Sequence, residues 1–325
     1  MFETTWIIWL QQGPQWLLPF MTVVSTLGND FIYMPLILFL IFFCKVRLGL
    51  QVMLALALVG VMIGTTKEGF ALPRPADIDV QVLDKGKQNF PLVADGAAKS
   101  FWALPDADAI ATVRQAKRDS YGFISGHTAN AVVFALAILL FCGVRSRWLW
   151  ALGLLWPVLT LLSRMYLGRH FLADTLGGIV AGLLAIALTM VLSRQLLATK
   201  AHYLPSALLM LCCGVCIMLA TTLDWLSPSA FGAVIGTLLC LIGSQKYDFI
   251  QADVSHWQRP LRLLLALGWV VAVQYLLDNL YLTTGLPDTH LLSAGFAAVG
   301  YPLAILGALW LCRLCRLSAT PQRAI

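Results

Sequence analysis

The feature that most constrains this chain is a series of apolar runs that approach the length of a membrane-spanning helix. Clear examples are residues 129–142, 148–162, 171–192 and 204–223. A helix needs roughly 17 to 25 mostly apolar residues to cross a bilayer. Hydrophobic residues make up 59% of the chain and charged residues only 12%, far fewer charges than the roughly 25% of a soluble domain. The sequence therefore predicts an all-α, polytopic membrane helical bundle.

Breaks between the apolar runs predict about nine spans. Residues 6–20 are expected to form an interfacial helix, with a first spanning helix as the alternative. The predicted spans are 31–44, 48–66, 127–143, 147–165, 170–193, 204–222, 228–243, 261–278 and 291–312.

Basic residues are placed in the turns on one side of these predicted spans. The positive-inside rule makes that side cytoplasmic, with the amino terminus outside and the carboxyl terminus inside. Topology thus accounts for the net charge of +6, and nucleic acid is not expected as a partner. The residues are Lys45, Arg47, Arg145, Arg147, Arg194, Lys200, Lys246, Arg259, Arg262, Arg313, Arg316 and Arg323.

A long polar insertion, about 67–126, lies opposite the basic turns and is expected to form a loop or small cap on the outer face. It exceeds the roughly 12 to 15 residues of a plain connection, which suggests a function. We predict a catalytic membrane core at 1–200 and appended transmembrane helices at 201–325. Four polar residues of the appended part are expected on the outer side, as exposed loop polarity or as part of a substrate entrance: Asp278, Asn279, Asp288 and His290.

Three short polar segments fall on this same outer face. They are 67–75 (Lys-Glu-Gly-Phe-Ala-Leu-Pro-Arg-Pro), 121–128 (Tyr-Gly-Phe-Ile-Ser-Gly-His-Thr) and 163–174 (Ser-Arg-Met-Tyr-Leu-Gly-Arg-His-Phe-Leu-Ala-Asp). The basic turns alone determine the predicted topology. The position of the three polar segments on one face is therefore independent support for a shared site. We expect the three segments to form one site.

The cations of these segments suit a phosphate group. Lys67, Arg74 and Arg164 would bring three positive charges together, and a guanidinium binds two phosphate oxygens in a fork. Ser125 and Gly126 stand at the start of a predicted helix, where free backbone N–H groups and the helix dipole favour an anion.

Two histidines and a carboxylate supply the remaining chemistry. His170 and Asp174 are four residues apart, so both project from one face of a helix start. An Asp that binds one ring nitrogen leaves the other free to attack phosphorus. His127 is then available as the general acid for the departing alkoxide. Arg169 would contact phosphate or pair with a loop carboxylate, and Asn29 and Asp30 would support the site or start a helix.

The ordered combination Lys-x6-Arg-Pro, Ser-Gly-His and Ser-Arg-x5-His-x3-Asp resembles the three signatures of the type 2 phosphatidic acid phosphatase (PAP2) superfamily, over roughly residues 25–195. The resemblance implies His170 as nucleophile, His127 as acid and Asp174 as orienter. It also implies phosphate binding by Lys67, Arg74 and Arg164, with Ser125 and Gly126 beside them, and chemistry without a metal or other cofactor. One departure is Ile124, where the family usually has proline, which puts the rigidity of that loop in question.

The sequence therefore predicts a phosphatase of the bacterial inner membrane that faces the periplasm and hydrolyses a lipid phosphate or diphosphate through a phosphohistidine. Candidate substrates are phosphatidic acid, phosphatidylglycerol phosphate, undecaprenyl diphosphate, a lipid A phosphate and a sphingoid base phosphate. Transfer of the phosphate to another lipid, or hydrolysis of a soluble substrate as in glucose-6-phosphatase, remains open. A transporter or scaffold would favour ionisable groups at mid-membrane depth or paired broken helices, and neither is evident.

Overall fold

The computed structural model describes residues 1–85, 90–117, 120–198, 202–220, 222–223, 225–249, 255–284 and 290–317. The predicted boundary at residue 200 lies outside these residues, as do Lys200, Asp288 and Arg323. Throughout the described part the regular elements are helices, together with one isolated bridge between Asp79 and Asp95. The predicted all-α membrane bundle is confirmed, and the chain is a multi-pass membrane protein.

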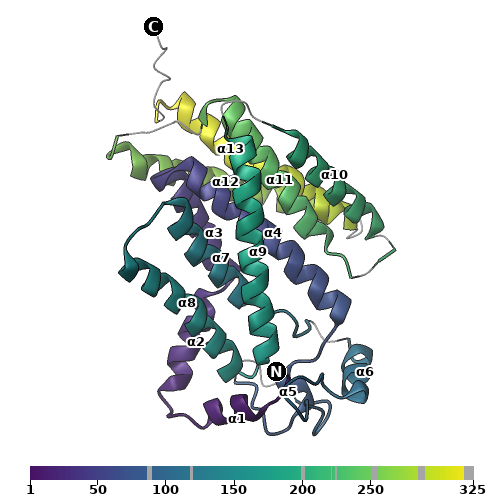
Figure 1. The fold of residues 1–325 in the computed structure, drawn as a ribbon. Coiled ribbons are helices and arrows are strands. Elements are labelled where there is room, and N and C mark those ends of the chain that lie inside the picture. Colours follow the sequence, from purple (N-terminus) through teal and green to yellow (C-terminus); the bar gives the residue numbers. More distant parts are fainter. Residues whose placement is uncertain are drawn as a thin grey trace. The chain divides into compact units, whose positions relative to one another are not determined.

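Contacts between residues divide the chain into two compact units. Unit 1 consists of Met1–Ile32 and Met62–Ala185, and unit 2 consists of Tyr33–Val61 and Ile186–Ile325. The helices are α1 (Thr5–Gln11), α2 (Leu17–Leu27), α3 (Asp30–Phe39), the π-helix η1 (Leu40–Cys44), α4 (Val46–Phe70), α5 (Pro75–Ile78), α6 (Ala107–Gln115), α7 (Gly126–Phe141), α8 (Arg147–Tyr166), α9 (Leu172–Leu196), α10 (Leu204–Leu219), α11 (Pro228–Lys246), α12 (Gln258–Thr284) and α13 (His290–Leu314) (Figure 1).

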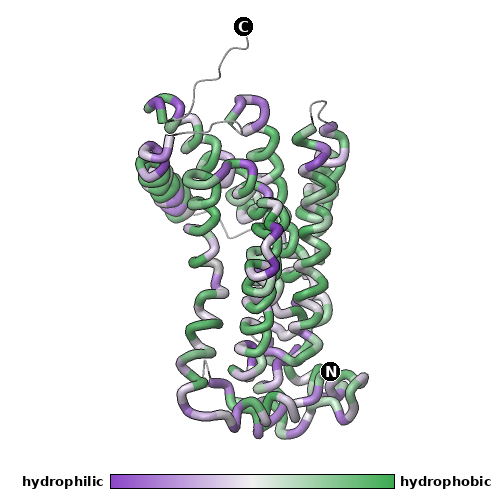
Figure 2. Tube along the Cα trace, turned by 60° about the vertical axis from the view of Figure 1, so that its left-hand side comes forward, coloured by the Kyte–Doolittle hydropathy of each residue, from purple (hydrophilic) through white to green (hydrophobic). Residues whose placement is uncertain are grey.

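Hydropathy along the long helices explains why they are suited to a membrane. They are hydrophobic over most of their length, and hydrophilic residues gather near their ends (Figure 2). Within the described residues, six helices are long and apolar enough to cross a bilayer, and the bent pair of α2 with the segment Phe31–Cys44 would make a seventh. The other two predicted spans correspond to α7 and α10, which are apolar but shorter. Length and composition therefore support six or seven of the nine predicted spans.

Two sequence expectations need correction. The single interfacial helix expected at 6–20 is broken, because α1 ends at Gln11 and α2 begins at Leu17, and the intervening Gly13 and Pro14 are poor residues for a helix interior. Arg262, expected in a cytoplasmic turn, lies inside α12 and is 4% exposed. Its Nη2 donates to the carbonyl of Ile41 at 3.2 Å, so the π-helix supplies a partner for this buried cation.

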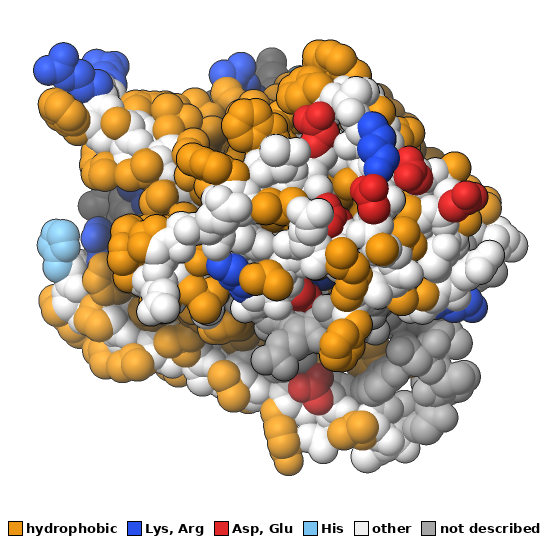
Figure 3. Space-filling view, turned by 90° about the horizontal axis from the view of Figure 1, so that it is seen from below, with side chains coloured by type: hydrophobic (Ala, Val, Ile, Leu, Met, Phe, Trp, Pro, Cys, Tyr) orange, Lys and Arg blue, Asp and Glu red, His pale blue; other side chains and the backbone are white. Residues whose placement is uncertain are grey.

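The described residues of the polar insertion form a structured cap within unit 1. It begins with the last turn of α4, contains α5 and α6, and shares a hydrophobic core with α1 and the turn between α8 and α9. Ile78 and Val113 of the cap are fully buried in the same cluster as Met165, at the end of α8, and Phe171, which follows His170 in the turn to α9. On the outside, acidic and basic side chains are interspersed with hydrophobic ones (Figure 3). The cap core thus fixes the turn that carries His170.

Candidate active site

The predicted nucleophile lies in the tight turn that joins α8 to α9. His170 is 2% exposed, and Asp174, in the first turn of α9, is fully buried. The Nδ1 atom of His170 is 3.4 Å from Oδ2 of Asp174, and the same carboxylate oxygen accepts from the backbone N–H of Phe171 at 2.9 Å. The carboxylate therefore faces Nδ1 and is itself held by the backbone of the turn.

The three predicted phosphate-binding cations come from three different elements. Lys67, in the last turn of α4, donates from Nζ to Ser120 Oγ at 3.0 Å and to the carbonyl of Tyr121 at 3.1 Å. Arg164, near the end of α8, is 9% exposed and donates from Nη1 to Ser25 Oγ at 2.7 Å. Arg74 is the residue that precedes α5.

Two guanidinium nitrogens in this group are buried without a hydrogen-bond partner among the described residues. They are Nε of Arg74 and Nε of Arg164. A buried donor with no acceptor is costly, and a cationic donor more so. Both side chains could satisfy this deficit with the oxygens of an anion, for which a guanidinium is well shaped.

The charges around His170 determine its protonation state. It lies before the first residue of α9, outside the spanning segments. Burial, followed by the positive charges of Arg164, Lys67 and Arg74, holds the pKa of His170 well below its usual value. The imidazole is therefore neutral near pH 7, which is the form that can act as a nucleophile.

The start of α7 contacts the start of α9. The backbone N–H of Ser125 donates to the carbonyl of Asp174 at 2.8 Å, and Ser125 is fully buried. Its Oγ also accepts from the N–H of Thr128, and this bond caps the helix. This contact links the second polar segment directly to the third, as expected.

His127, in the first turn of α7, is oriented by an amide side chain. Its Nε2 lies 2.8 Å from Oδ1 of Asn29. Because an amide oxygen only accepts hydrogen bonds, Nε2 carries the proton in this arrangement. Nearby, a Cβ on Gly28 would meet the His127 ring at 3.2 Å, so the chain before α3 packs closely on this histidine. Asn29 thus supports the site, one of the two roles that its sequence position allowed.

The predicted site residues of this arrangement lie in a part of the chain that matches a known protein family. Residues 48–198 match the family model described as the PAP2 superfamily. This part of the chain belongs to the PAP2 superfamily. All eight predicted site residues, from Lys67 to Asp174, lie inside the PAP2 region.

Two curated relatives share part of this region. The lipid A 4'-phosphatase of Bacteroides thetaiotaomicron is 38% identical over 78 residues, which are 24% of this chain and 34% of that protein. The lipid A 4'-phosphatase of Porphyromonas gingivalis is 38% identical over 79 residues, 24% of this chain and 32% of that protein. The chain thus spans about a third of the length of each curated relative that it matches. The crystal structure of Aquifex aeolicus LpxE aligns at 21% identity with a TM-score of 0.39, over 55% of this chain and 88% of that chain.

Ile124, the departure from the usual PAP2 signature, is packed against α9. It is 3% exposed, and a Cβ on Gly177 would lie only 2.7 Å from its Cγ2. A branched apolar side chain therefore fills the space between the loop before α7 and the glycine-rich face of α9. This packing immobilises the loop by contact, where proline would do so through its ring.

Arg169, the residue before the predicted nucleophile His170, pairs with a carboxylate of the cap. Its Nη2 is 3.2 Å from Oδ1 of Asp84, and the two side chains are only 7% and 3% exposed. The sequence had left this partner open between phosphate and a loop carboxylate, and the structure shows the carboxylate. Nothing in the sequence marked Asp84 among the acidic residues of the insertion, and nothing marked Ser25 as the partner of Arg164.

No group of three or more His, Cys, Asp or Glu side chains in the described residues could hold a metal ion. The chemistry available from these residues is that of two histidines, one carboxylate and several cations. Such a set can bind an oxyanion, attack it and protonate a leaving group.

Proposed function

We propose that this protein hydrolyses a lipid phosphate at the periplasmic face of a bacterial inner membrane, through a phosphohistidine on His170. The observation that carries the proposal is the cluster of cations beside a neutral, buried histidine, in which the buried Nε atoms of both Arg74 and Arg164 lack a partner among the described residues. Such donors suit the nonbridging oxygens of a phosphate, where charge must be stabilised during transfer. Membership of residues 48–198 in the PAP2 superfamily supports the same reaction class.

In the first step, Nε2 of His170 attacks phosphorus while the bond from phosphorus to the lipid oxygen breaks. Asp174, which faces Nδ1 at 3.4 Å, orients the ring and stabilises the positive charge that develops on it. His127 enters this step with both ring nitrogens protonated. It gives the Nδ1 proton to the departing lipid oxygen, so the lipid leaves as an alcohol and the His127 ring becomes neutral. Asn29 holds the His127 ring through the bond at Nε2.

In the second step, water attacks the phosphohistidine, and its proton passes to His127. The nitrogen–phosphorus bond breaks, inorganic phosphate leaves, and His170 returns to its neutral form. Lys67, Arg74 and Arg164 stabilise the phosphoryl oxygens in both steps. Gly126, at the amino end of α7, adds its backbone N–H to the same group. The N–H of Ser125 donates to the carbonyl of Asp174, so Ser125 contributes by holding this helix start beside the site.

For the substrate we propose a phosphate on a glycolipid of the lipid A type. Both curated relatives are named lipid A 4'-phosphatase. A site built at the ends of spanning helices also suits a substrate whose acyl chains stay in the bilayer while its phosphate reaches Arg74 and Arg164.

The test uses purified protein and lipid A that carries its 4'-phosphate. We expect release of inorganic phosphate and a lipid product lighter by one phosphate, as measured by mass spectrometry. His170→Ala should abolish release. His202→Ala is the matched control, since His202 is an exposed residue before α10, and it should leave the rate unchanged.

Retained phosphate release by His170→Ala would refute the mechanism. If the wild type instead releases phosphate from phosphatidic acid but not from lipid A, the mechanism stands and the substrate is wrong. Appearance of the phosphate on a second lipid, with little free phosphate, would show transfer in place of hydrolysis.

A further inference from the structure

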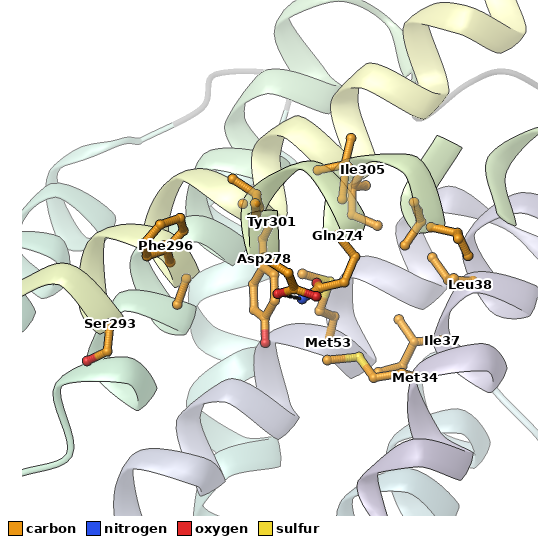
Figure 4. Close-up of a pocket in the computed structure, with 17 residues that line it drawn as sticks. Met34, Ile37, Leu38, Met53, Gln274, Asp278, Ser293, Phe296, Tyr301 and Ile305 are labelled. Atoms are coloured by element: carbon orange, nitrogen blue, oxygen red, sulfur yellow. Dashed lines mark hydrogen bonds between the residues drawn. The ribbon is translucent and has the colours of Figure 1, made fainter. Parts of the chain in front are cut away.

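Unit 2 contains a pocket of about 680 Å³ whose walls come from α3, α4, α12 and α13. The volume lies within the range of roughly 300–1,000 Å³ that is typical of ligand pockets. Most of the lining is aliphatic, aromatic or thioether, including Met34, Met53 and Phe296 (Figure 4). The polar side chains of the lining are Gln274, Asp278, Ser293 and Tyr301.

Two of these polar residues form a pair on one face of α12. Gln274 and Asp278 are one helical turn apart, and Nε2 of Gln274 donates to Oδ1 of Asp278 at 2.9 Å. Figure 4 shows both side chains directed toward Met53 and Met34, with the ring of Tyr301 beside Asp278. The hydrogen bond uses one carboxylate oxygen, and Oδ2 has no partner among the described residues.

The position of Asp278 is unusual for a carboxylate. It lies near the end of the apolar segment Gln258–Leu280, which is long enough to span a membrane. Ionisable residues in such segments are costly and commonly mark functional sites. Of the residues that line the pocket, Asp278 is the charged one, so the pocket combines an apolar volume with one negative charge and no compensating cation.

We infer that this pocket binds a lipid whose headgroup carries a hydroxyl and no phosphate. Its main walls, α12 and α13, are helices of membrane-spanning length and composition, so acyl chains are the apolar molecules at hand, and an apolar cavity favours them over water. A hydroxyl can donate to Asp278. A phosphate would meet like charge, which disfavours binding.

This inference is independent of the proposed function, because it concerns unit 2 and is tested by binding without turnover. The probes are two lipids with identical chains, diacylglycerol and phosphatidic acid, each with a photoreactive diazirine near the end of one chain. Full-length protein in lipid nanodiscs is irradiated with each probe, and labelled peptides are identified by mass spectrometry. We expect diacylglycerol to label peptides of α12 and α13 about tenfold more than phosphatidic acid does, a difference of ~1.4 kcal/mol.

Matched substitutions on α13 test the location. Ala297 lines the pocket, so Ala297→Trp should fill it and abolish labelling by diacylglycerol. Val299, two residues away, is 56% exposed and does not line the pocket, so Val299→Trp should keep the labelling. Elution as a single symmetrical peak shows that each variant is folded.

Asp278→Asn tests the chemistry without a change of volume. An amide still accepts a hydrogen bond from a hydroxyl but has no charge, so labelling by phosphatidic acid should rise to the level of diacylglycerol. The inference is wrong if the wild type labels equally with both probes, if Ala297→Trp retains labelling in a folded protein, or if α12 instead cross-links to α12 of a second copy.

Discussion

At the scale of single residues, the Asp84–Arg169 ion pair balances charge beside His170, the proposed nucleophile. Lys67, Arg74 and Arg164 lie around His170, and Arg169 would add a fourth positive charge. Asp84 lies 3.2 Å from Arg169, and both side chains are almost completely buried. The pair therefore neutralises Arg169 and ties the cap to the turn that carries His170.

Removal of the charge on Asp84 should destabilise the protein. Asp84→Asn leaves Arg169 buried without its counter-ion, and the loss of one partner from a buried pair typically costs about 3–5 kcal/mol. The control is Asp95→Asn, since Asp95 pairs with Lys99 at the surface, with side chains 72% and 65% exposed. An exposed pair contributes roughly 0–1 kcal/mol. Thermal unfolding in detergent should show a large loss for Asp84→Asn and little change for Asp95→Asn, and equal losses would contradict this account.

A second prediction at this scale follows from the lowered pKa of His170. The unfolded chain binds a proton at this residue below about pH 6.5, whereas the folded protein does not until a lower pH. The resulting stabilisation is complete above pH 6.5 and is lost as the pH falls, by up to about 1.4 kcal/mol per pH unit.

The unfolding temperature of the wild type should therefore fall more than that of His170→Gln between about pH 7.5 and about pH 5.5. At about pH 7.5 neither protein carries a proton at position 170, so the unfolding temperature of each protein at that pH is its reference. Parallel curves for the two proteins would mean that His170 is not held neutral by the fold.

The site residues differ in how far their contacts can be predicted from the sequence. His170 and Asp174 could be paired from the sequence because four residues bring two side chains to one face of a helix start. Ser25 and Asp84 could not, because their partners Arg164 and Arg169 are 139 and 85 positions away and only the folded chain brings them together. Asn29 is intermediate, since its place before a helix suggested a role but not its contact with His127.

At the scale of elements, α9 approaches α7 closely because it has glycines where the two helices meet. A Cβ on Gly178 would lie 2.6 Å from the carbonyl oxygen of Ser125, and one on Gly182 would lie 2.8 Å from Cγ1 of Val132. Small residues spaced four apart allow such close contact between membrane helices. The short distance between α7 and α9 sets the position of Ser125 relative to Asp174.

Gly178→Ala should therefore impair catalysis. The obstructing atom is a backbone oxygen that cannot rotate away, so the start of α7 must shift, and a displacement of about 1 Å in a catalytic site can cost on the order of 100-fold in rate. The control is Gly60→Ala in α4, where nothing lies within 4 Å of the added Cβ. Phosphate release should fall strongly for Gly178→Ala and be unchanged for Gly60→Ala. An unimpaired Gly178→Ala enzyme would show that α7 can move without cost.

Element positions were largely predictable, because apolar runs of limited length mark where a chain can cross a membrane. The expected spans 48–66 and 147–165 correspond to α4 and α8. The prediction was wrong where a polar residue lies inside a helix and its hydrogen-bond partner is far away in the sequence. Arg262 is the example, since its partner Ile41 is 221 positions away and its charge alone suggested a turn.

At the scale of the whole molecule, the site geometry restricts which helices can cross the membrane. α7 begins beside Asp174, α8 packs against α7 and ends at Tyr166, and the two are joined by the short turn 142–146. If α8 crossed the bilayer and α7 did not, Ser125 and Asp174 would lie on opposite sides. Their bond of 2.8 Å excludes that arrangement. The two helices therefore cross together or not at all.

We predict that both cross, although α7 has only 16 residues and a length of ~24 Å against a hydrocarbon core of about 30 Å. Residues just before α7 and in the turn after it would complete the path.

The test places single cysteines in a full-length variant that lacks the eight native cysteines. Ser100→Cys lies in the cap and Ser146→Cys in the turn, and both serines are exposed. A membrane-impermeant maleimide added to intact cells should label Ser100→Cys at once but label Ser146→Cys only after lysis. Equal labelling of both in intact cells would place the cap and the turn on one side, and neither α7 nor α8 would then be a span.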